Sequence, residues 1–317
     1  MELIRGAHNL RPRHRGSVVT IGNFDGVHLG HQAVLGQLAE KGAELGLPTV
    51  AVTFEPLPRE YFMGERSPAR LQRFRDKLLA MRRFSINRLL CLNFNPALAG
   101  MSAQDFIREL LVERLGVRHL VVGDDFRFGK GRAGNFETLR EAGRVHGFDV
   151  AHMHTFHIDG ARVSSTRIRG ALAEGRMDEA EKLLGRPYRI NGRVAHGDKK
   201  GHLLGFPTAN LRLGPCPMAV RGVFAVEVFG LPGEPVQGVA NAGTRPTVGG
   251  IQNRLEVHLF DVDADLYGKH LHVDLLHRLR DEQRFASLDE LRAQIARDAD
   301  HARAFFQVRP SDARSPD

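Results

Sequence analysis

The chain has 317 residues, of which 42% are hydrophobic, and it carries a formal net charge of +8 at pH 7. This composition excludes a disordered or collagen-like protein, and the length is typical of about two domains. The basic balance favours polyanionic partners, such as nucleotides, nucleic acid or an anionic membrane, without choosing among them. No apolar run approaches the roughly 18 residues of a membrane span, and the N-terminal residues lack the apolar core of a signal peptide. We therefore expect a cytoplasmic protein that does not associate with a membrane.

Residues 1–186 alternate short β-branched runs with segments of helical periodicity. We expect strands at residues 17–24, 48–54, 88–94, 119–126 and 148–156, and helices that begin at His31, Ala69, Ala103 and Asn135. The order strand, helix, strand forces parallel pairing, because the helical crossover returns the chain to the same end of the sheet. The N-terminal half is therefore predicted to be a doubly wound, Rossmann-like α/β domain that binds its ligand at the carboxyl ends of its strands.

The periodicity changes from about Tyr188 onward. Strand-like segments separated by turn residues occur at residues 189–197, 208–213, 222–230, 236–243, 254–261 and 270–279. They predict an all-β domain, an antiparallel barrel, which is followed by one C-terminal helix that begins at the capping-box pattern of Ser287 and Glu290. We place the domain boundary after a helix at residues 171–185. The predicted domains are residues 1–186 and 187–310, and we expect residues 311–317 to form a disordered tail.

The segment GNFDGVHLGH, residues 22–31, joins a predicted strand to a predicted helix. A helix N-terminus presents unpaired N–H groups and a partial positive charge, and both attract phosphate. His28 and His31 share one helix face, where their imidazoles can donate hydrogen bonds to a phosphate that gains charge in a transition state. For a bare His-x-x-His pattern, two surface histidines at an ordinary turn are the better interpretation. The strand, the glycines and the helix around it favour a nucleotide site instead.

Two further segments have the chemistry of phosphate binding. SSTRIRG, residues 164–170, combines Ser and Thr, which cap helices, with arginines that suit phosphate oxygens. PTAN, residues 207–210, places Thr208 and Asn210 on one strand face, and their hydroxyl and amide oxygens are hard ligands suited to Mg²⁺. A helix cap with solvated arginines and an ordinary strand are the respective alternatives. Together with the histidine segment, these patterns indicate two phosphate-transfer centres in one chain.

The order of the motifs resembles that of one known family. The similar segments are GNFDGVHLGH, TFEPLPREYF, VVGDDFRFG, SSTRIRG, HGDKKGHLLGFPTANL, GVANAGTRPTV, LEVHLFD and RLRDEQRFASLDEL. They resemble those of the prokaryotic bifunctional riboflavin kinases/FMN adenylyltransferases, also called FAD synthetases, over nearly the whole chain. The resemblance implies that the C-terminal half phosphorylates riboflavin to FMN with ATP, and that the nucleotidyltransferase half transfers AMP from ATP to FMN, giving FAD and pyrophosphate. The expected partners are these small molecules and not nucleic acid.

In the N-terminal half, the resemblance assigns catalysis to His28 and His31. It implies that ATP is bound by Gly22, Asn23, Phe24, Asp25, Gly30, Ser164, Ser165, Thr166 and Arg167. Asp125 and Phe128, in the segment GDDFRFG, are the expected flavin contacts. The FMN phosphate is already a competent nucleophile, so positioning and charge stabilisation should provide the rate without a covalent intermediate.

In the C-terminal half, the resemblance implies that Glu256 is the base that accepts the proton of the riboflavin 5′-hydroxyl. Without the resemblance, a Glu that alternates with apolar residues is more often on a solvated strand face. Thr208 and Asn210 are expected to hold Mg²⁺, and Arg280 and Glu282 are expected to lie near the flavin. The ATP phosphates are expected to contact a glycine-rich segment through Gly197, Lys199, Gly201, Gly205 and Pro207.

The sequence departs from the family pattern at two positions. Leu57 stands where many relatives carry His, and since Leu cannot form side-chain hydrogen bonds, no polar role is transferred to it. His202 stands where many relatives carry Arg, so a permanent positive charge at neutral pH is lost there.

Two alternative functions remain open at this point. The chain could be a nucleic-acid-binding protein that uses a nucleotidyltransferase-like scaffold and its basic surface without turnover, or it could retain only one of the two activities. Formation of FMN and then FAD from riboflavin, ATP and Mg²⁺ supports the enzyme, whereas salt-sensitive RNA retention without flavin products supports the binding protein. The sequence does not indicate an oligomeric state.

Overall fold

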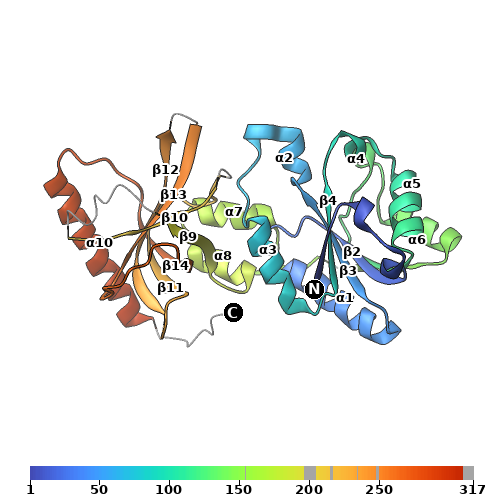
Figure 1. The fold of residues 1–317 in the computed structure, drawn as a ribbon, viewed down its shortest axis with the longest axis horizontal. Helices are drawn as coiled ribbons and strands as arrows, with labels where there is room; N and C mark the ends of the chain where they lie inside the picture. The colour runs from blue at the N-terminus through green and yellow to red at the C-terminus, as the bar shows by residue number, and fades with distance from the viewer. Residues whose placement is uncertain (154, 196–204, 215–216, 234, 248–249, 310–317) are drawn as a thin grey trace. The chain divides into compact units, whose positions relative to one another are not determined.

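The computed structural model describes residues 1–153, 155–195, 205–214, 217–233, 235–247 and 250–309 (Figure 1). The chain divides into two compact units, Met1–Pro68 with Gln72–Ser165, and Ala69–Leu71 with Thr166–Asp317. Each unit contains its own main β-sheet and its own hydrophobic core. The predicted domain boundary between residues 186 and 187 follows the change of periodicity, and it stays a prediction.

The first unit is built on a six-stranded parallel sheet in the order β1-β4-β3-β2-β5-β6. Its strands are β1 (Glu2–Arg5), β2 (Ser17–Ile21), β3 (Thr49–Glu55), β4 (Arg88–Asn93), β5 (Val117–Gly123) and β6 (Asp149–Met153). Its helices are α1 (Leu29–Leu45), α2 (Pro58–Met63), α3 (Phe74–Met81), α4 (Pro96–Gly100), α5 (Ala103–Asp105) with its π-helical continuation η5 (Phe106–Arg114), and α6 (Phe136–His146). A short hairpin consists of β7 (His157–Ile158) and β8 (Ala161–Arg162).

Helices cover both faces of this sheet. On one face, Val18 of β2 belongs to an apolar cluster with Leu35 of α1. On the opposite face, the adjacent Val19 belongs to a second cluster with Leu111 of η5 and Leu139 of α6. Successive strand residues point to opposite faces, so a strand that is buried on both sides has a continuous apolar run instead of an alternating one. The predicted doubly wound α/β fold is confirmed.

The strand order reverses between β2 and β5, which are neighbours in the sheet. From β2 the chain continues to β3 and β4 on one side, and it then crosses to β5 on the other side. Such a reversal creates the crevice in which open α/β sheets bind ligands, outside the carboxyl ends of the strands. The segments that follow β2 and β5, residues 22–28 and 124–129, begin at this reversal. Both contain residues that were predicted to bind substrate.

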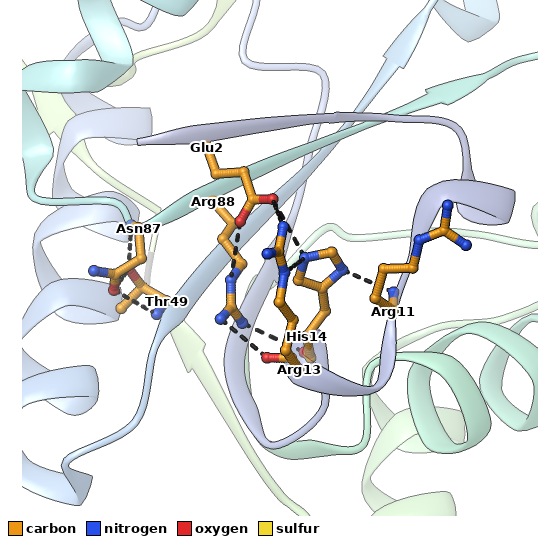
Figure 2. A network of polar contacts seen from close by, with 7 residues as sticks. All are labelled: Glu2, Arg11, Arg13, His14, Thr49, Asn87 and Arg88. Carbon is orange, nitrogen blue, oxygen red and sulfur yellow. Dashed lines mark hydrogen bonds and ion pairs between the residues drawn. The ribbon is translucent and has the colours of Figure 1, made fainter.

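Polar contacts anchor the edge strand β1, which the sequence patterns did not predict (Figure 2). The Glu2 carboxylate accepts a hydrogen bond from the Arg13 guanidinium at 2.8 Å and lies 3.3 Å from Nε2 of His14. Arg88 of β4 lies 3.8 Å from the same carboxylate and also donates to the Arg13 carbonyl oxygen at 3.1 Å. A strand of four residues is too short for its periodicity to be recognised in the sequence. In the structure, these polar contacts and the pairing with β4 hold β1 in place.

Helices α7 (Ser165–Ala173) and α8 (Met177–Leu184) precede a closed antiparallel barrel in the order β10-β13-β12-β11-β14-β9. The barrel strands are β9 (Tyr188–Ala195), β10 (Ala209–Arg212), β11 (Gly222–Phe229), β12 (Val236–Thr247), β13 (Gly250–Leu259) and β14 (His270–Arg280). Helix α10 (Leu288–Val308) packs against the barrel, where Ala302 and Phe306 join a cluster with Val223 of β11 and Leu276 of β14.

The predicted barrel and its C-terminal helix are confirmed, and Ser287 Oγ accepts a hydrogen bond from the Glu290 N–H at 3.2 Å as the capping pattern predicted. Two helix predictions were wrong. The helix expected from Ala69 begins at Phe74, because Arg73 has extended backbone angles. The single helix expected over residues 171–185 is two helices, because Gly175 adopts a φ of 76° between them. Among the described residues, no helix is long and apolar enough to cross a membrane.

Candidate active sites

The loop between β2 and α1 holds the two predicted catalytic histidines. Its backbone is left-handed at Phe24 (φ 47°), Gly26 (φ 91°) and Val27 (φ 41°), and the two non-glycine positions are strained. His28 caps α1, and its Nδ1 accepts the backbone N–H of His31 at 3.3 Å. The two imidazoles are stacked, with ring centroids 3.6 Å apart and an angle of 17° between their planes. Because Nδ1 of His28 is an acceptor, its ring proton in the neutral form is on Nε2.

The pKa of His31 is lowered well below its ordinary value of 6.5, first by desolvation and then by electrostatic interactions with His28, Lys77 and Arg162. Phe24 packs edge-on against this ring at 5.3 Å. Among the described residues, Nδ1 of His31 is buried and has no hydrogen-bond partner. His31 is therefore a neutral imidazole near pH 7, and it can donate one hydrogen bond without introducing a charge.

Asp25, predicted to bind ATP, is 1% exposed. Its carboxylate accepts hydrogen bonds from the Arg59 guanidinium of α2 at 2.7 Å and from the Gln72 N–H at 3.4 Å. Its carbonyl oxygen accepts the hydroxyl of Ser165 at 2.9 Å. Asp25 thus joins the histidine loop to α2, and it brings the predicted Ser165 to this loop.

Other predicted residues of this site lie close to the same loop. Gly22 follows β2 directly, and its N–H donates to the Val52 carbonyl oxygen of β3 at 3.0 Å. A Cβ at Gly30 would lie 3.3 Å from the His28 ring, so the glycine allows that ring to lie against the helix. Asn23 and Ser164 flank these contacts in sequence. The structure therefore brings together the predicted nucleotide-site residues of the loop between β2 and α1 with the predicted serines at residues 164–165.

The second predicted phosphate segment continues into the other unit. Thr166 and Arg167 belong to that unit, together with the rest of α7. Within it, Arg167 Nε donates to the Glu179 carboxylate of α8 at 2.8 Å. Its role in triphosphate binding stays a prediction.

The two predicted flavin contacts after β5 differ in accessibility. Asp125 forms an ion pair with Arg162 of β8, the arginine whose charge also acts on His31. Phe128 is only 8% exposed, and its ring is stacked on Phe126 with centroids 5.5 Å apart. Phe128 therefore packs into the apolar cluster of this unit. Asp125 instead pairs with an arginine that interacts electrostatically with His31.

Leu57, the first departure from the family pattern, is 1% exposed at the start of α2. Its side chain is part of the interior, and its backbone N–H donates to the Glu60 carboxylate at 2.9 Å. An apolar residue therefore suits this position.

In the barrel, three polar residues on neighbouring strands form one row, and two of them are predicted site residues. Glu256 of β13 is directly opposite Asn210 of β10 on one side and Asn241 of β12 on the other. The buried Leu255 and Val257 alternate with Glu256, so Glu256 points away from the barrel interior. Its side chain keeps 22% of its surface exposed. The predicted base and the predicted metal ligand Asn210 are therefore neighbours.

Arg254 connects these two groups, although no sequence motif had indicated it. It lies two residues before Glu256 on the same strand face and forms an ion pair with the Glu256 carboxylate. Its Nε donates to Oδ1 of Asn210 at 3.2 Å. The Asn210 amide oxygen, the predicted Mg²⁺ ligand, therefore accepts a hydrogen bond from a cationic side chain. The i, i+2 spacing on a strand is a signal by which Arg254 could have been found.

The predicted flavin residues Arg280 and Glu282 make different contacts. Arg280 forms a bidentate ion pair with Asp298 of α10 and so links β14 to α10. Its Nε lies 2.9 Å from Oδ1, and its Nη2 lies 2.8 Å from Oδ2. The Glu282 carboxylate lies over Gly243, where any Cβ would collide with it. Gly243 is opposite Arg254, which lies two residues before Glu256 on β13, so Glu282 lies near this row.

The predicted ATP-binding glycine segment is only partly described. Gly205 has a φ of 81°, and the Pro207 carbonyl oxygen accepts a hydrogen bond from Nδ1 of His258 at 2.9 Å. Thr208 is half-buried two residues before Asn210. The predicted Gly197, Lys199 and Gly201, and the divergent His202, lie outside the described residues.

No group of three or more His, Cys, Asp or Glu side chains that could hold a metal ion is present in the part of the chain that the structure describes. Thr208 and Asn210, the predicted metal ligands, both have uncharged side chains, and their role in binding Mg²⁺ stays a prediction.

Comparison with known proteins decides the family. The sequence model of FAD synthetase matches residues 10–167, and that of riboflavin kinase matches residues 184–306. The bifunctional riboflavin kinase/FMN adenylyltransferase of Escherichia coli K12 is 53% identical over 96% of this chain and 98% of its own length. The protein of the same name from Pseudomonas fluorescens is 52% identical over 96% and 97%. The chain belongs to the bifunctional riboflavin kinase/FMN adenylyltransferase family.

The FAD synthetase model matches the N-terminal half and the riboflavin kinase model matches the C-terminal half, as the resemblance of the motifs implied. The solved structure of a macrolide-efflux protein from Streptococcus pneumoniae is similar over 96% of this chain and 99% of its own length, with a TM-score of 0.81 and 29% identity. That likeness supports one common fold over both halves. The efflux name applies to the Streptococcus pneumoniae protein alone, whereas the family sequences that match this chain carry flavin names.

Proposed function

We infer that the chain is a bifunctional riboflavin kinase and FMN adenylyltransferase, and we propose that each activity uses one of the two sites described above. Riboflavin is the first substrate, FMN is the intermediate and FAD is the product. One observation supports the division of labour: the stacked histidines lie at the reversal of the parallel sheet, and Glu256 lies opposite Asn210 in a barrel that belongs to the other compact unit.

For the kinase, we propose that ATP is the phosphoryl donor and Glu256 is the base. The riboflavin 5′-oxygen forms a bond to the γ-phosphorus as its proton passes to the Glu256 carboxylate, and the bond between the γ-phosphorus and the bridging oxygen breaks to release ADP. Thr208 and Asn210 would hold Mg²⁺, which neutralises phosphate charge when it is bound. Arg254 orients both Glu256 and Asn210, since it contacts both side chains.

For the adenylyltransferase, an oxygen of the FMN phosphate attacks the α-phosphorus of ATP, and the bond to the bridging oxygen breaks to release pyrophosphate. Negative charge increases on the α-phosphate oxygens during this step. Nε2–H of His28, one N–H of the neutral His31 and the N-terminus of α1 would stabilise that charge. The remaining predicted ATP residues, from Gly22 to Gly30 and from Ser164 to Arg167, would hold the triphosphate, and Asp125 would contact the flavin.

We do not retain the two alternative functions, a chain with only one activity and a nucleic-acid-binding protein without turnover. Both family sequence models match, one in each half, which argues against a chain with a single activity. A nucleic-acid-binding protein without turnover does not explain why relatives named for flavin chemistry match over nearly the full length. We keep small molecules as the proposed partners and the cytoplasm, where ATP is available, as the proposed compartment.

The purified full-length chain tests the proposal when it is incubated with riboflavin, ATP and Mg²⁺ and the products are separated by chromatography. We expect FMN first and FAD later, with ADP and pyrophosphate as the accompanying products. A second reaction that starts from FMN should give FAD without ADP. Absence of FMN from the first reaction, or of FAD from the second, would contradict the corresponding half of the proposal.

A further inference from the structure

A buried lysine lies behind the histidine loop. Lys77, on α3, is only 2% exposed, although lysine is rarely buried because desolvating an ammonium group is costly. Its Nζ donates to the Asn23 carbonyl oxygen at 2.7 Å and to Oγ1 of Thr53 at 3.4 Å. Thr53 of β3 is fully buried, and its hydroxyl donates to the same Asn23 oxygen at 3.3 Å. Two elements thus fix one peptide group at the start of the loop.

The position of this peptide group is important for the histidines. Asn23 directly precedes Phe24, the first of two non-glycine residues with left-handed φ angles, of 47° and 41°, that lie before His28. Such backbone angles persist only where the surrounding contacts hold them. Without the contacts to the Asn23 carbonyl group, the loop could relax toward ordinary angles and change the position of His28, which caps α1 and stacks on His31.

The charge of Lys77 acts on the same site. Desolvation is the largest cause of the lowered pKa of His31, and His28, Lys77 and Arg162 lower it further. Arg162 also pairs with Asp125, whereas Lys77 brings a buried amino group into this set. An apolar side chain of similar length would fill the same space without the desolvation cost of an ammonium group. The retained charge therefore suggests a role beyond packing.

We propose that Lys77 is a positioning residue for adenylyl transfer, whose buried ammonium group fixes the Asn23 carbonyl group at the start of the histidine loop. This inference rests on the proposed role of the histidines in the N-terminal half. It assigns no contact between Lys77 and substrate. Its two consequences, on geometry and on charge, can be separated with different substitutions.

The test compares Lys77→Met, Lys77→Arg and the matched control Lys41→Met in the full-length chain. Lys41 lies on α1 in the same unit, pairs with Glu44 and retains 29% of its side-chain surface. The first readout is a histidine NMR titration without substrates, with the His31 resonance assigned by its loss in His31→Gln. The second is the dependence of FMN adenylylation on pH and on substrate concentration. Riboflavin phosphorylation by the same samples reports that the other unit is folded.

We expect Lys77→Met to lower kcat for adenylylation roughly 100-fold, because a small misplacement of catalytic groups has an effect of that order. The KM for ATP should change much less. His31 should titrate at higher pH than in the wild type, and the acidic limb of the pH profile should move in the same direction. Lys77→Arg should keep the low titration of His31 while losing part of kcat, and Lys41→Met should match the wild type.

Three outcomes would overturn the inference. They are a folded Lys77→Met chain whose kcat stays within about twofold of the wild type, an unchanged His31 titration in that variant, or an equal shift in Lys41→Met. If Lys77→Met does not fold, Thr53→Val replaces it: the inference requires a lower kcat with unchanged His31 titration, and an unchanged kcat overturns it. A wild-type chain that does not adenylylate FMN would contradict the proposed function, whereas the titration still tests Lys77.

Discussion

The two candidate sites are held in place by different physical means. The histidine loop of the first unit is strained, largely desolvated and held by buried polar contacts from α2, α3 and β3. The Glu256 row of the barrel is partly exposed and is positioned by the register of β10, β13 and β12. Adenylyl transfer should therefore be sensitive to substitutions remote in sequence from its histidines. Phosphoryl transfer should depend mainly on the side chains of Glu256 and its cross-strand neighbours Asn210 and Asn241.

The largest expected effect is that of Glu256→Gln on the barrel site. Removing the proposed base should lower kcat for riboflavin phosphorylation by roughly 100- to 10,000-fold. Adenylylation of supplied FMN should be unchanged, because the histidines belong to the other unit. Separate assays that start from riboflavin and from FMN check this outcome. Loss of both activities from a folded variant would contradict two independent sites.

The converse change is the double substitution His28→Ala with His31→Ala. Loss of hydrogen-bond donors to a transition-state charge typically costs about 100- to 1,000-fold, so the variant should convert riboflavin to FMN and stop there. The ratio of FAD to FMN after complete consumption of riboflavin gives the measurement, with circular dichroism as the control for folding. Normal FAD formation would exclude the histidines from the mechanism.

A smaller effect should follow from Gly243→Ala, which tests whether Glu282 is part of the kinase site. The added Cβ would displace the Glu282 carboxylate that lies over Gly243, and we expect the KM for riboflavin to rise about tenfold with a smaller change in kcat. Gly233→Ala is a barrel control in which the Cβ meets no atom within 4 Å, although its φ of 93° is itself strained. A riboflavin KM equal to that of the wild type would remove Glu282 from the proposed flavin contacts.

The smallest effect is a pH dependence of stability that comes from His31. Its folded pKa is lowered from 6.5, so the unfolded chain binds more protons once the pH falls below that value. The stabilisation is present above pH 6.5 and is lost as the pH falls toward the lowered folded pKa. Urea unfolding at pH 7.5 and pH 5.5 should show a smaller loss of stability for His31→Gln than for the wild type. Equal losses would contradict the lowered pKa.

Much of the fold could be predicted from local patterns. The six barrel strands were all recognised, because they are short strand-like segments separated by turn residues such as Pro232, Gly233 and Gly268. The edge strand β1 was missed because four residues carry too little periodicity. The helix over residues 171–185 was predicted as continuous because apolar spacing does not reveal that Gly175 has a positive φ.

The candidate sites could be predicted only where their residues are close in sequence. His28 and His31 are three residues apart, and Thr208 and Asn210 are two apart, so the periods of a helix and a strand place each pair on one face. Lys77 could not be found in this way, because it lies on α3 and nothing in its surroundings in the sequence indicates a contact with Asn23. The same holds for Arg59 and its contact with Asp25.

The sequence by itself therefore determined the two types of sheet, the order of the motifs and the identity of the side chains that can bind phosphate, because these depend on residue type and on short-range spacing. The tertiary structure decided which way the histidine loop turns, which buried charges act on His31, and that Glu256 lies opposite Asn210. The physical reason is that electrostatic shifts and backbone strain depend on distances in space between segments, and strand pairing brings together residues that are far apart along the chain.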